Sequence, residues 1–355
     1  MKKVFLFGYY GFGNLGDELL CKYYTKLLSD NFSGLKIIIL TGKQICWETK
    51  LGSITVSRWN LWQLGKIIAP GDLLLGGGGS IFQDATSKRS LFYYLALLAL
   101  AHRCGAEIIL VGQGFGPLSP LGKKLARPIL DLTRIISCRD PKSLADIKMM
   151  GVTKPLMHLE VDPLWDLEFS GRPLAKKNKG KQPVLGFFFR KGDLNRKQKL
   201  FAGLYRRSVE IKLITLFPDD FFAAKKFAQE TGISPPLLIK ELDDLSIVFP
   251  EISFVIGEKL HGLLLAAKCG IPGIGLSNDP KIEAFCQQME WPCFSWKERY
   301  LEKQIIGAVE ELLSDINLTY QHLLRKSDEL VTKSREERDW FLQQIEEALL
   351  CSRKK

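Results

Sequence analysis

Residues 252–281 of the 355-residue chain bring together side chains that could hold an anion and move a proton. The stretch predicts a buried strand, a sharp turn, a helix, a second strand and a loop. Lys259 and His261 follow the first strand, and Lys281 follows the second. In an open α/β sheet, residues just past the carboxyl ends of neighbouring parallel strands face one crevice, which binds the ligand. Two ammonium groups and an imidazole there predict a small, strongly anionic substrate that needs proton transfer.

Two arginines stand at similar junctions elsewhere in the chain. Arg139 follows a short strand predicted at 135–137, and Arg190 follows one predicted at 184–189. A guanidinium group between a strand and a helix is well placed to bind a phosphate or a carboxylate. For Arg139 the alternative is a structural ion pair with Asp140 or another acid. Arg139 and Arg190 are therefore candidate anion ligands.

The chain contains four histidines, and one of them lies in the predicted anion site. His102 ends an apolar predicted helix, His158 precedes a predicted strand, and His322 lies in a charged predicted helix. Structural roles account for these three. Because an imidazole titrates near neutral pH, His261 is the candidate catalytic acid and base.

A glycine-rich loop, GYYGFGNLGDELL at 8–20, follows the first predicted strand. It matches the G-x-G-x-x-G pattern of dinucleotide-binding sites. The next strand, at 35–40, lacks the acid that would bind a ribose, which argues against a nicotinamide nucleotide. The loop is then either a tight turn without a ligand or a set of backbone amides directed at one. In the second case Gly13, Asn14 and Asp17 are candidate substrate contacts, with Asp17 as the helix N-cap.

Four consecutive glycines at 76–79 follow an apolar strand predicted at 73–75. Such a run costs chain entropy and usually allows another group to approach the backbone closely. A polar cluster follows the run, and a solvent-exposed loop would also explain that cluster. If the approaching group is a ligand, the candidate substrate contacts are Gly78, Gly79, Ser80, Gln83 and Asp84.

Strands and helices alternate along most of the chain, which predicts an α/β fold with two Rossmann-like domains. The expected N-terminal domain covers 1–169 and carries the glycine-rich loops. A basic linker at 170–182 leads to a donor-binding domain at 183–300. A helical segment at 301–355 follows, and its long charged helix could pack over both domains or form a dimer contact.

Composition narrows the class of partner. The net charge of +11 suits nucleic acid, an anionic membrane face or a phosphorylated substrate, but no nucleic-acid-binding motif is present. The eight cysteines form no metal-binding pattern and are expected to be reduced thiols in a cytoplasmic protein.

The apolar start of the chain is too short and too rich in glycine for a signal peptide. The longest apolar run, at 91–101, is too short to span a bilayer and predicts a buried helix.

Six ordered motifs resemble the polysaccharide pyruvyl transferase family, notably the CsaB type of cell-wall ketal-pyruvyl transferases. They are GYYGFGNLGDE (8–18), LLLGGGGSIFQDATSKRSLFYYL (73–95), VGQGFGPL (111–118), SCRDPKSL (137–144), VDP (161–163) and EKLHGLLLAAKCGIP with SNDPKI (258–282). The resemblance covers residues 1–310. It implies a GT-B-like architecture, with two Rossmann-like domains facing a cleft. It places Arg139, His261 and Lys281 among the functional residues. Lys259 departs from the family's pattern, in which an arginine is expected.

The resemblance also implies the reaction. Pyruvate is transferred from phosphoenolpyruvate onto two hydroxyls of a sugar, which gives a cyclic ketal. The acceptor is a surface polysaccharide or its lipid-linked precursor, and no cofactor is expected. The phosphate and the carboxylate of the donor need at least two cations, which Arg139, Lys259 and Lys281 supply, with Arg190 as a further candidate. Loose docking on an anionic inner membrane face would suit such an acceptor.

Two other functions fit the same residues. A GT-B glycosyltransferase would use a nucleotide sugar and would need an acid for the ribose, for which Glu258 or Glu283 are candidates. A non-catalytic protein that binds a glycan or a lipid phosphate would bind the ligand without releasing phosphate.

Overall fold

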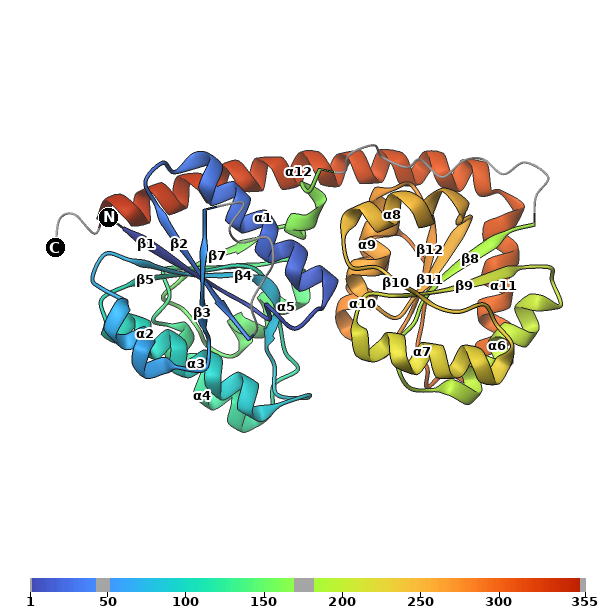
Figure 1. Cartoon of the computed structure of the whole chain (residues 1–355), viewed down its shortest axis with the longest axis horizontal. Helices are drawn as coiled ribbons and strands as arrows, with labels where there is room; N and C mark the ends of the chain where they lie inside the picture. The colour runs from blue at the N-terminus through green and yellow to red at the C-terminus, as the bar shows by residue number, and fades with distance from the viewer. Residues whose placement is uncertain (1, 43–51, 169–181, 352–355) are drawn as a thin grey trace. The chain divides into compact units, whose positions relative to one another are not determined.

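The computed structural model describes residues 2–42, 52–168 and 182–351 (Figure 1). The chain divides into two compact units: one comprises the residues up to Leu167 together with those from Thr332 onward, and the other comprises Glu168–Val331. The segment 301–355 is therefore shared between the two units. The linker expected at 170–182 lies outside the described residues except for Gln182.

The first unit contains a parallel sheet in the order β3-β2-β1-β4-β5-β6-β7. Its strands are β1 (Lys3–Phe7), β2 (Lys36–Thr41), β3 (Ile54–Ser57), β4 (Leu73–Phe82), β5 (Glu107–Phe115), β6 (Ile135–Cys138) and β7 (Leu156–Leu159). The central strands are continuous apolar runs, because helices cover both faces of a parallel sheet. The strand order reverses between β1 and β4, and ligands bind at such a switch point in folds of this class.

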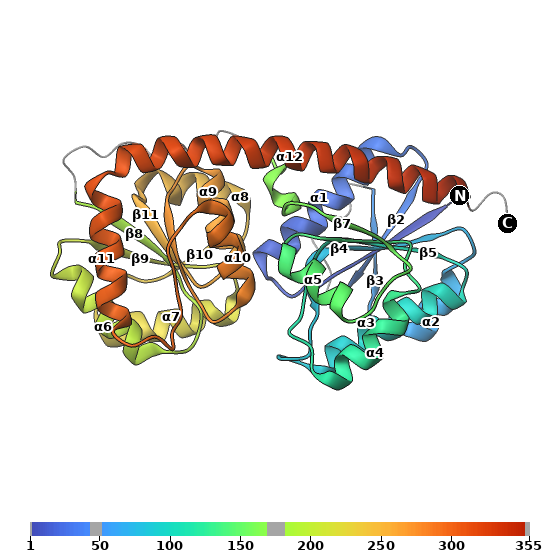
Figure 2. The same cartoon turned by 180° about the vertical axis from the view of Figure 1, so that it is seen from behind.

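The helices of this unit form a layer on each face of the sheet. They are α1 (Leu15–Asn31), α2 (Leu61–Ile67), α3 (Lys88–Arg103), α4 (Pro120–Leu130) and α5 (Pro141–Met149), with a short 3-10 helix at Pro163–Trp165. Figures 1 and 2 show α1 on one face and α2, α3 and α4 side by side on the other. Four of the α-helices begin at side chains that cap them, namely Asn60, Ser87, Ser119 and Asp140.

The glycine run belongs to a strand, which extends beyond the predicted end at residue 75 and reaches Phe82. A Cβ atom on Gly77 would lie 2.5 Å from Tyr10 Oη and 2.8 Å from a methyl group of Leu6. The Tyr10 hydroxyl donates a hydrogen bond of 2.8 Å to the Gly77 carbonyl. The group that approaches this part of the backbone is therefore a side chain of the protein itself, buried in the core.

The second unit repeats the same topology, in the order β10-β9-β8-β11-β12-β13. Its strands are β8 (Val184–Phe188), β9 (Glu210–Thr215), β10 (Leu237–Leu238), β11 (Phe254–Gly257), β12 (Gly273–Leu276) and β13 (Cys293–Phe294). Its helices are α6 (Leu194–Tyr205), α7 (Pro218–Thr231), α8 (Leu242–Val248), α9 (Leu260–Lys268), α10 (Pro280–Met289) and α11 (Leu301–Ser314). The switch point here lies between β8 and β11.

The last helix, α12 (Ile316–Cys351), contributes to both units. In the second unit the Tyr320 hydroxyl donates to the Ser253 carbonyl at 2.8 Å. In the first unit the His158 ring hydrogen-bonds to Glu337 and stacks on Trp340, with 4.2 Å between ring centroids. The predicted α/β class, with two parallel sheets and a long C-terminal helix, is confirmed. Among the described helices, none is both long and apolar enough to cross a bilayer.

Candidate functional site

Four neighbouring strands of the second sheet end in charged or titratable side chains. In the sheet order β9-β8-β11-β12, they lead to Asp220, Arg190, the pair Lys259 and His261, and Lys281. Arg190 and Lys259 therefore flank the switch point between β8 and β11, where ligands bind in such sheets. The structure thus gathers at one edge the cations and the imidazole that the sequence analysis selected from this half of the chain.

The helix that carries His261 begins directly after β11. Lys259 is the N-cap residue of α9, and His261 is the second residue of the helix and is half-buried. Position 262 must be glycine, because a Cβ atom there would lie 2.6 Å from the ring of Phe188. This close contact fixes the first turn of α9 against β8, at the switch point.

Lys259 forms an ion pair with a buried acid in the first turn of α7. Its Nζ lies 2.7 Å from Asp220 Oδ2, and the Asp220 side chain is 3% exposed. The other carboxylate oxygen of Asp220 accepts from the amide of Lys191 at 3.0 Å. Asp220 therefore orients the Lys259 ammonium and also holds the loop that carries Arg190.

Glu258 lies beneath this cluster and is buried. Its carboxylate lies 3.0 Å from Lys197 Nζ and accepts from Trp296 Nε1 at 2.8 Å and from the Arg190 amide at 3.1 Å. Burial raises the pKa of Glu258 and lowers the pKa of Lys197, and their mutual attraction opposes both shifts. Because its carboxylate already has these three partners, Glu258 supports the site from inside and is not a candidate ribose ligand. The other acid considered for that role, Glu283, is exposed in the first turn of α10.

Lys281 pairs with the acid that begins its own helix. Its Nζ lies 3.1 Å from Asp279 Oδ2, and its amide donates to Asp279 Oδ1 at 3.2 Å. Burial raises the pKa of Asp279, but the charge and hydrogen bonds of Lys281 and the charge of Arg190 outweigh this, so that the net pKa is lowered. Asp279 therefore stays ionised and orients Lys281.

Arg139, in the first unit, is almost completely buried between three strand ends. One guanidinium nitrogen lies 2.8 Å from Asp162 Oδ2, and the other donates to Ser80 Oγ at 3.0 Å. Gly114 leaves room for this arrangement, because a Cβ atom there would lie 2.5 Å from Ser80 Oγ. The acid that pairs with Arg139 is Asp162 and not its neighbour Asp140, which caps α5.

The amides of the first glycine loop are directed at a side chain of the chain itself. The N–H groups of Gly11, Phe12 and Gly13 donate to Glu18 Oε1 at 2.8, 3.1 and 3.1 Å. The prediction that Asp17 is the N-cap is wrong. Asn14 occupies that position, and its amide nitrogen hydrogen-bonds to Asp17 inside the first turn.

The remaining candidates of the first unit have local partners. Gly78 and Gly79 adopt positive φ angles of 82° and 92°, and a Cβ atom on Gly79 would lie 3.0 Å from Asp17 Oδ1. Gln83 accepts from the Thr86 amide at 3.0 Å. Asp84 accepts from the Ser119 amide at 2.9 Å and from the Ser119 hydroxyl. Their proposed contacts with substrate stay predictions.

Sequence reasoning missed Glu160, which follows β7. Its Oε1 accepts from the Gly112 amide and from the Ser137 hydroxyl, and burial raises its pKa to about 7 although both hydrogen bonds lower it. The acid lies two residues before Asp162, so the VDP motif marked its neighbourhood. Among the described residues, no three His, Cys, Asp or Glu side chains are grouped to hold a metal ion.

Comparison with solved structures shows the same fold throughout the chain. HepE of Anabaena, in complex with UDP-glucose, matches with a TM-score of 0.65 and 12% identity over 97% of this chain and 100% of its own. A glycosyltransferase from Rickettsia africae matches at 0.66 and 10% identity, over 100% and 99% of the two chains. Sucrose-phosphate synthase from Thermosynechococcus elongatus matches at 0.66 and 11%, over 99% and 100%. The fold is thus that of GT-B glycosyltransferases.

Sequence comparison identifies the family. None of the curated proteins matches the sequence. The family model of polysaccharide pyruvyl transferases matches residues 14–280, a range that begins in the first glycine loop and ends at the start of α10. It includes Arg139, Arg190, Lys259 and His261. The chain therefore belongs to the polysaccharide pyruvyl transferase family, a family of transferases that modify polysaccharides.

Proposed function

We propose that the protein transfers pyruvate from phosphoenolpyruvate onto two hydroxyls of one sugar, in a cell-surface polysaccharide or its lipid-linked precursor, and so forms a cyclic ketal. We place this reaction in the cytoplasm. The observation that carries the proposal is the cluster at the carboxyl edge of β8, β11 and β12, where His261 accompanies Lys259, Lys281 and Arg190. Family membership supports the transferase activity on a glycan.

The cations of the cluster suit the two anionic groups of the donor. Lys259 and Lys281 each have a carboxylate neighbour, at 2.7 and 3.1 Å, which orients the ammonium groups. Arg190 is exposed, and its backbone is held by Glu258. In this proposal the donor's phosphate and carboxylate bind these three side chains. Arg139 stays a proposed anion contact of the first unit, in addition to its pairing with Asp162.

The chemistry requires one proton donor and acceptor near neutral pH, and we assign this role to His261. A proton is added to the methylene carbon of phosphoenolpyruvate, and a sugar hydroxyl attacks the cationic carbon that results and loses its proton. The C–O bond to phosphate then breaks, and inorganic phosphate leaves. A second hydroxyl attacks the same carbon, loses its proton and closes the ring. The overall reaction involves no change of oxidation state, so it needs no redox cofactor.

Donor binding and turnover can be measured separately to test the proposal. Phosphoenolpyruvate at about 100 times its dissociation constant should stabilise the protein by about 2.7 kcal/mol in thermal unfolding. The Lys281→Ala variant should lose this stabilisation. The His261→Gln variant should keep it, while phosphate release with a panel of sugar glycosides should fall by about 10²- to 10⁴-fold. His322→Gln, the same substitution on α12, is the control and should have no effect.

Two results would replace this function with another one. Stabilisation by nucleotide sugars but not by phosphoenolpyruvate would favour a GT-B glycosyltransferase, for which the fold itself is the supporting observation. Stabilisation by phosphoenolpyruvate without phosphate release, in the presence of every acceptor tested, would favour a non-catalytic binding protein.

A further inference from the structure

Three neighbouring helices of the first unit carry positive charge and contain no acid. The helices α2, α3 and α4, which lie side by side on one face of the sheet (Figures 1 and 2), contain no Asp or Glu. Their seven Lys and Arg residues are Lys66, Lys88, Arg89, Arg103, Lys123, Lys124 and Arg127. On the opposite face, α1 contains Asp17, Glu18 and Asp30 among its residues. We call the outward surface of α2, α3 and α4 the basic face.

Most of these cations are available to an outside partner, although Arg127 Nε donates to the Gly151 carbonyl at 3.0 Å and Lys66 Nζ lies 3.2 Å from the centre of the Trp62 ring. All seven side chains are exposed, and none of them forms an ion pair within the described part of the chain. On α7, by contrast, the exposed Lys226 is paired with Glu230. Because seven cations gather on three helices that contain no acid, the basic face will attract an anionic surface.

Large apolar side chains project from the same helices. Trp62 of α2 is 73% exposed, Phe92 of α3 is 47% exposed, and Leu121 of α4 is 55% exposed. Lys and Arg combined with exposed Trp, Phe and Leu are typical of helices that lie in the interface of a bilayer. A partner that offers charge alone, such as a nucleic acid backbone, would leave these apolar groups in water.

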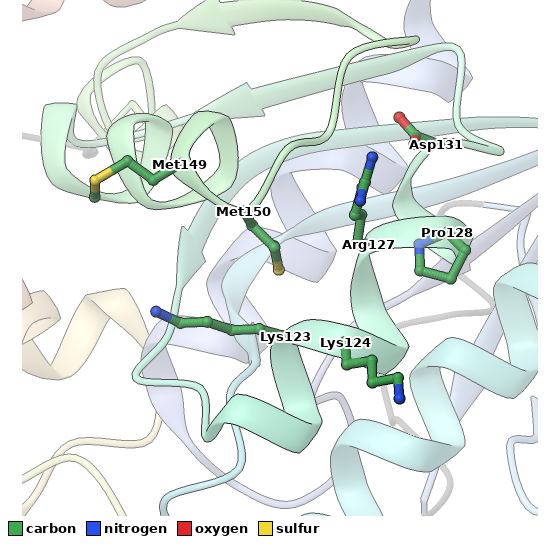
Figure 3. Close-up of a pocket in the computed structure, with 7 residues that line it drawn as sticks. All are labelled: Lys123, Lys124, Arg127, Pro128, Asp131, Met149 and Met150. Carbon is green, nitrogen blue, oxygen red and sulfur yellow. The ribbon is translucent and has the colours of Figure 1, made fainter.

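The edge of the basic face contains a depression of about 630 Å³ between α4 and the end of α5. Figure 3 shows its lining, which consists of Lys123, Lys124, Arg127 and Pro128 of α4, Asp131 just past the end of α4, and Met149 and Met150 at the end of α5. The lining thus combines cations and apolar groups with one acid, Asp131, which lies beside Arg127. A phosphate group at the surface of a bilayer could enter it beside Lys123 and Lys124.

We propose that the basic face docks the first unit on a bilayer that contains anionic lipids, with the cations among the headgroups and Trp62, Phe92 and Leu121 inserted at the interface. The described residues provide no membrane-spanning helix, so this attachment is peripheral and reversible. A lipid-linked acceptor, as the proposed function has it, would be presented at the same surface. The docking itself does not depend on the donor.

Sedimentation with lipid vesicles tests the proposal. The full-length protein should bind vesicles that contain phosphatidylglycerol and should not bind vesicles of phosphatidylcholine alone. The Lys123→Gln/Lys124→Gln variant should bind about 25-fold more weakly, because each cation near an anionic surface contributes about fivefold. The Trp62→Ala/Leu121→Ala variant should bind about tenfold more weakly, because apolar area is no longer buried.

The control variant is Lys225→Gln/Lys226→Gln, which removes the same charge from α7, a helix that also exposes Phe222 but contains acids. It should bind like the wild type. Equal binding to both kinds of vesicle, or to neither, would overturn the proposal. So would wild-type binding by the Trp62→Ala/Leu121→Ala variant, which would point to a polyanion as partner. Because no donor is present, a failure here leaves the stabilisation by phosphoenolpyruvate untouched.

Discussion

The ammonium group of Lys259 lies 2.7 Å from the carboxylate of Asp220, and this pair joins the first turn of α7 to the start of α9. These residues are 39 positions apart in the sequence. The lysine thus has an anionic neighbour, and an incoming anion must share its charge with that acid. In the proposed function, the pair therefore sets how strongly this part of the site attracts the donor.

Replacing Asp220 by Asn should strengthen donor binding. The amide can still accept from the Lys191 amide, so the loop keeps its hydrogen bond, but the negative charge beside Lys259 is lost. The dissociation constant of phosphoenolpyruvate should fall by about five- to tenfold, or about 1 to 1.4 kcal/mol, in titration calorimetry. Asp219→Asn, at the exposed neighbouring position, should leave it nearly unchanged. Unchanged binding by the Asp220→Asn variant would show that Lys259 does not contact the donor, and weaker binding would show that the orientation of Lys259 by Asp220 matters more than the charge of the acid.

The buried pair of Lys197 and Glu258 should be a main support of the second unit. Replacing Lys197 by Met leaves Glu258 buried without its cation, and we expect a loss of about 3–5 kcal/mol in the free energy of unfolding, measured by urea denaturation. The double variant with Glu258→Gln should lose less than the sum of the two single variants. As a control, Glu310→Gln breaks the exposed pair with Arg207 and should cost less than about 1 kcal/mol. Additive losses would mean that the two side chains do not interact.

The grouping of the candidate site could be predicted from sequence because it depends on local patterns. A buried apolar strand followed by Lys259 and His261, and a second strand followed by Lys281, place three side chains at one edge in any parallel sheet. No packing detail is needed for this conclusion. The same reasoning placed Arg190 at the end of β8, which the structure shows to be the neighbour of β11.

The partners of these side chains could not be predicted, because they come from distant parts of the chain. Glu258 contacts Lys197, which lies 61 residues away, and Tyr10 occupies the space beside Gly77, which lies 67 residues away. Glycines and acids look alike in sequence whether a ligand or the protein's own core requires them. For the same reason the amides of Gly11–Gly13 suggested a ligand, whereas the structure directs them at Glu18.

The core position of Gly77 leads to a prediction about stability. A Gly77→Ala substitution puts a methyl group 2.5 Å from Tyr10 Oη, and relieving that overlap should cost about 1–3 kcal/mol of folding free energy, seen as a lower Tm. Gly307 provides the matched control. It lies in α11, and a Cβ atom added there would have no neighbouring atom within 4 Å, so Gly307→Ala should raise stability by about 0.5–1 kcal/mol. Equal effects of the two substitutions would contradict the packing described around Tyr10.

Glu160 should make the stability of the protein depend on pH near neutrality. Burial raises its pKa from 4.5 to about 7 in the folded protein. The folded state therefore holds a proton that the unfolded state has released, and this contribution to stability is fully present below pH 4.5 and is lost as the pH rises through 7. The shift corresponds to about 3 kcal/mol. Glu160→Gln cannot ionise, and its side-chain oxygen can still accept from Gly112 and Ser137.

The free energy of unfolding of the Glu160→Gln variant, measured in urea from about pH 5 to pH 8, should therefore increase relative to that of the wild type by up to about 3 kcal/mol. The hydrogen bond to Glu337 raises the pKa of His158. His158 is present in both proteins, so most of its contribution cancels in the difference between them. Glu336→Gln, an exposed change on α12, should give a difference that does not vary with pH. A constant difference for Glu160→Gln would mean that the carboxyl group is already ionised at the acidic end of this range, in which case its hydrogen bonds to Gly112 and Ser137 outweigh the cost of burial.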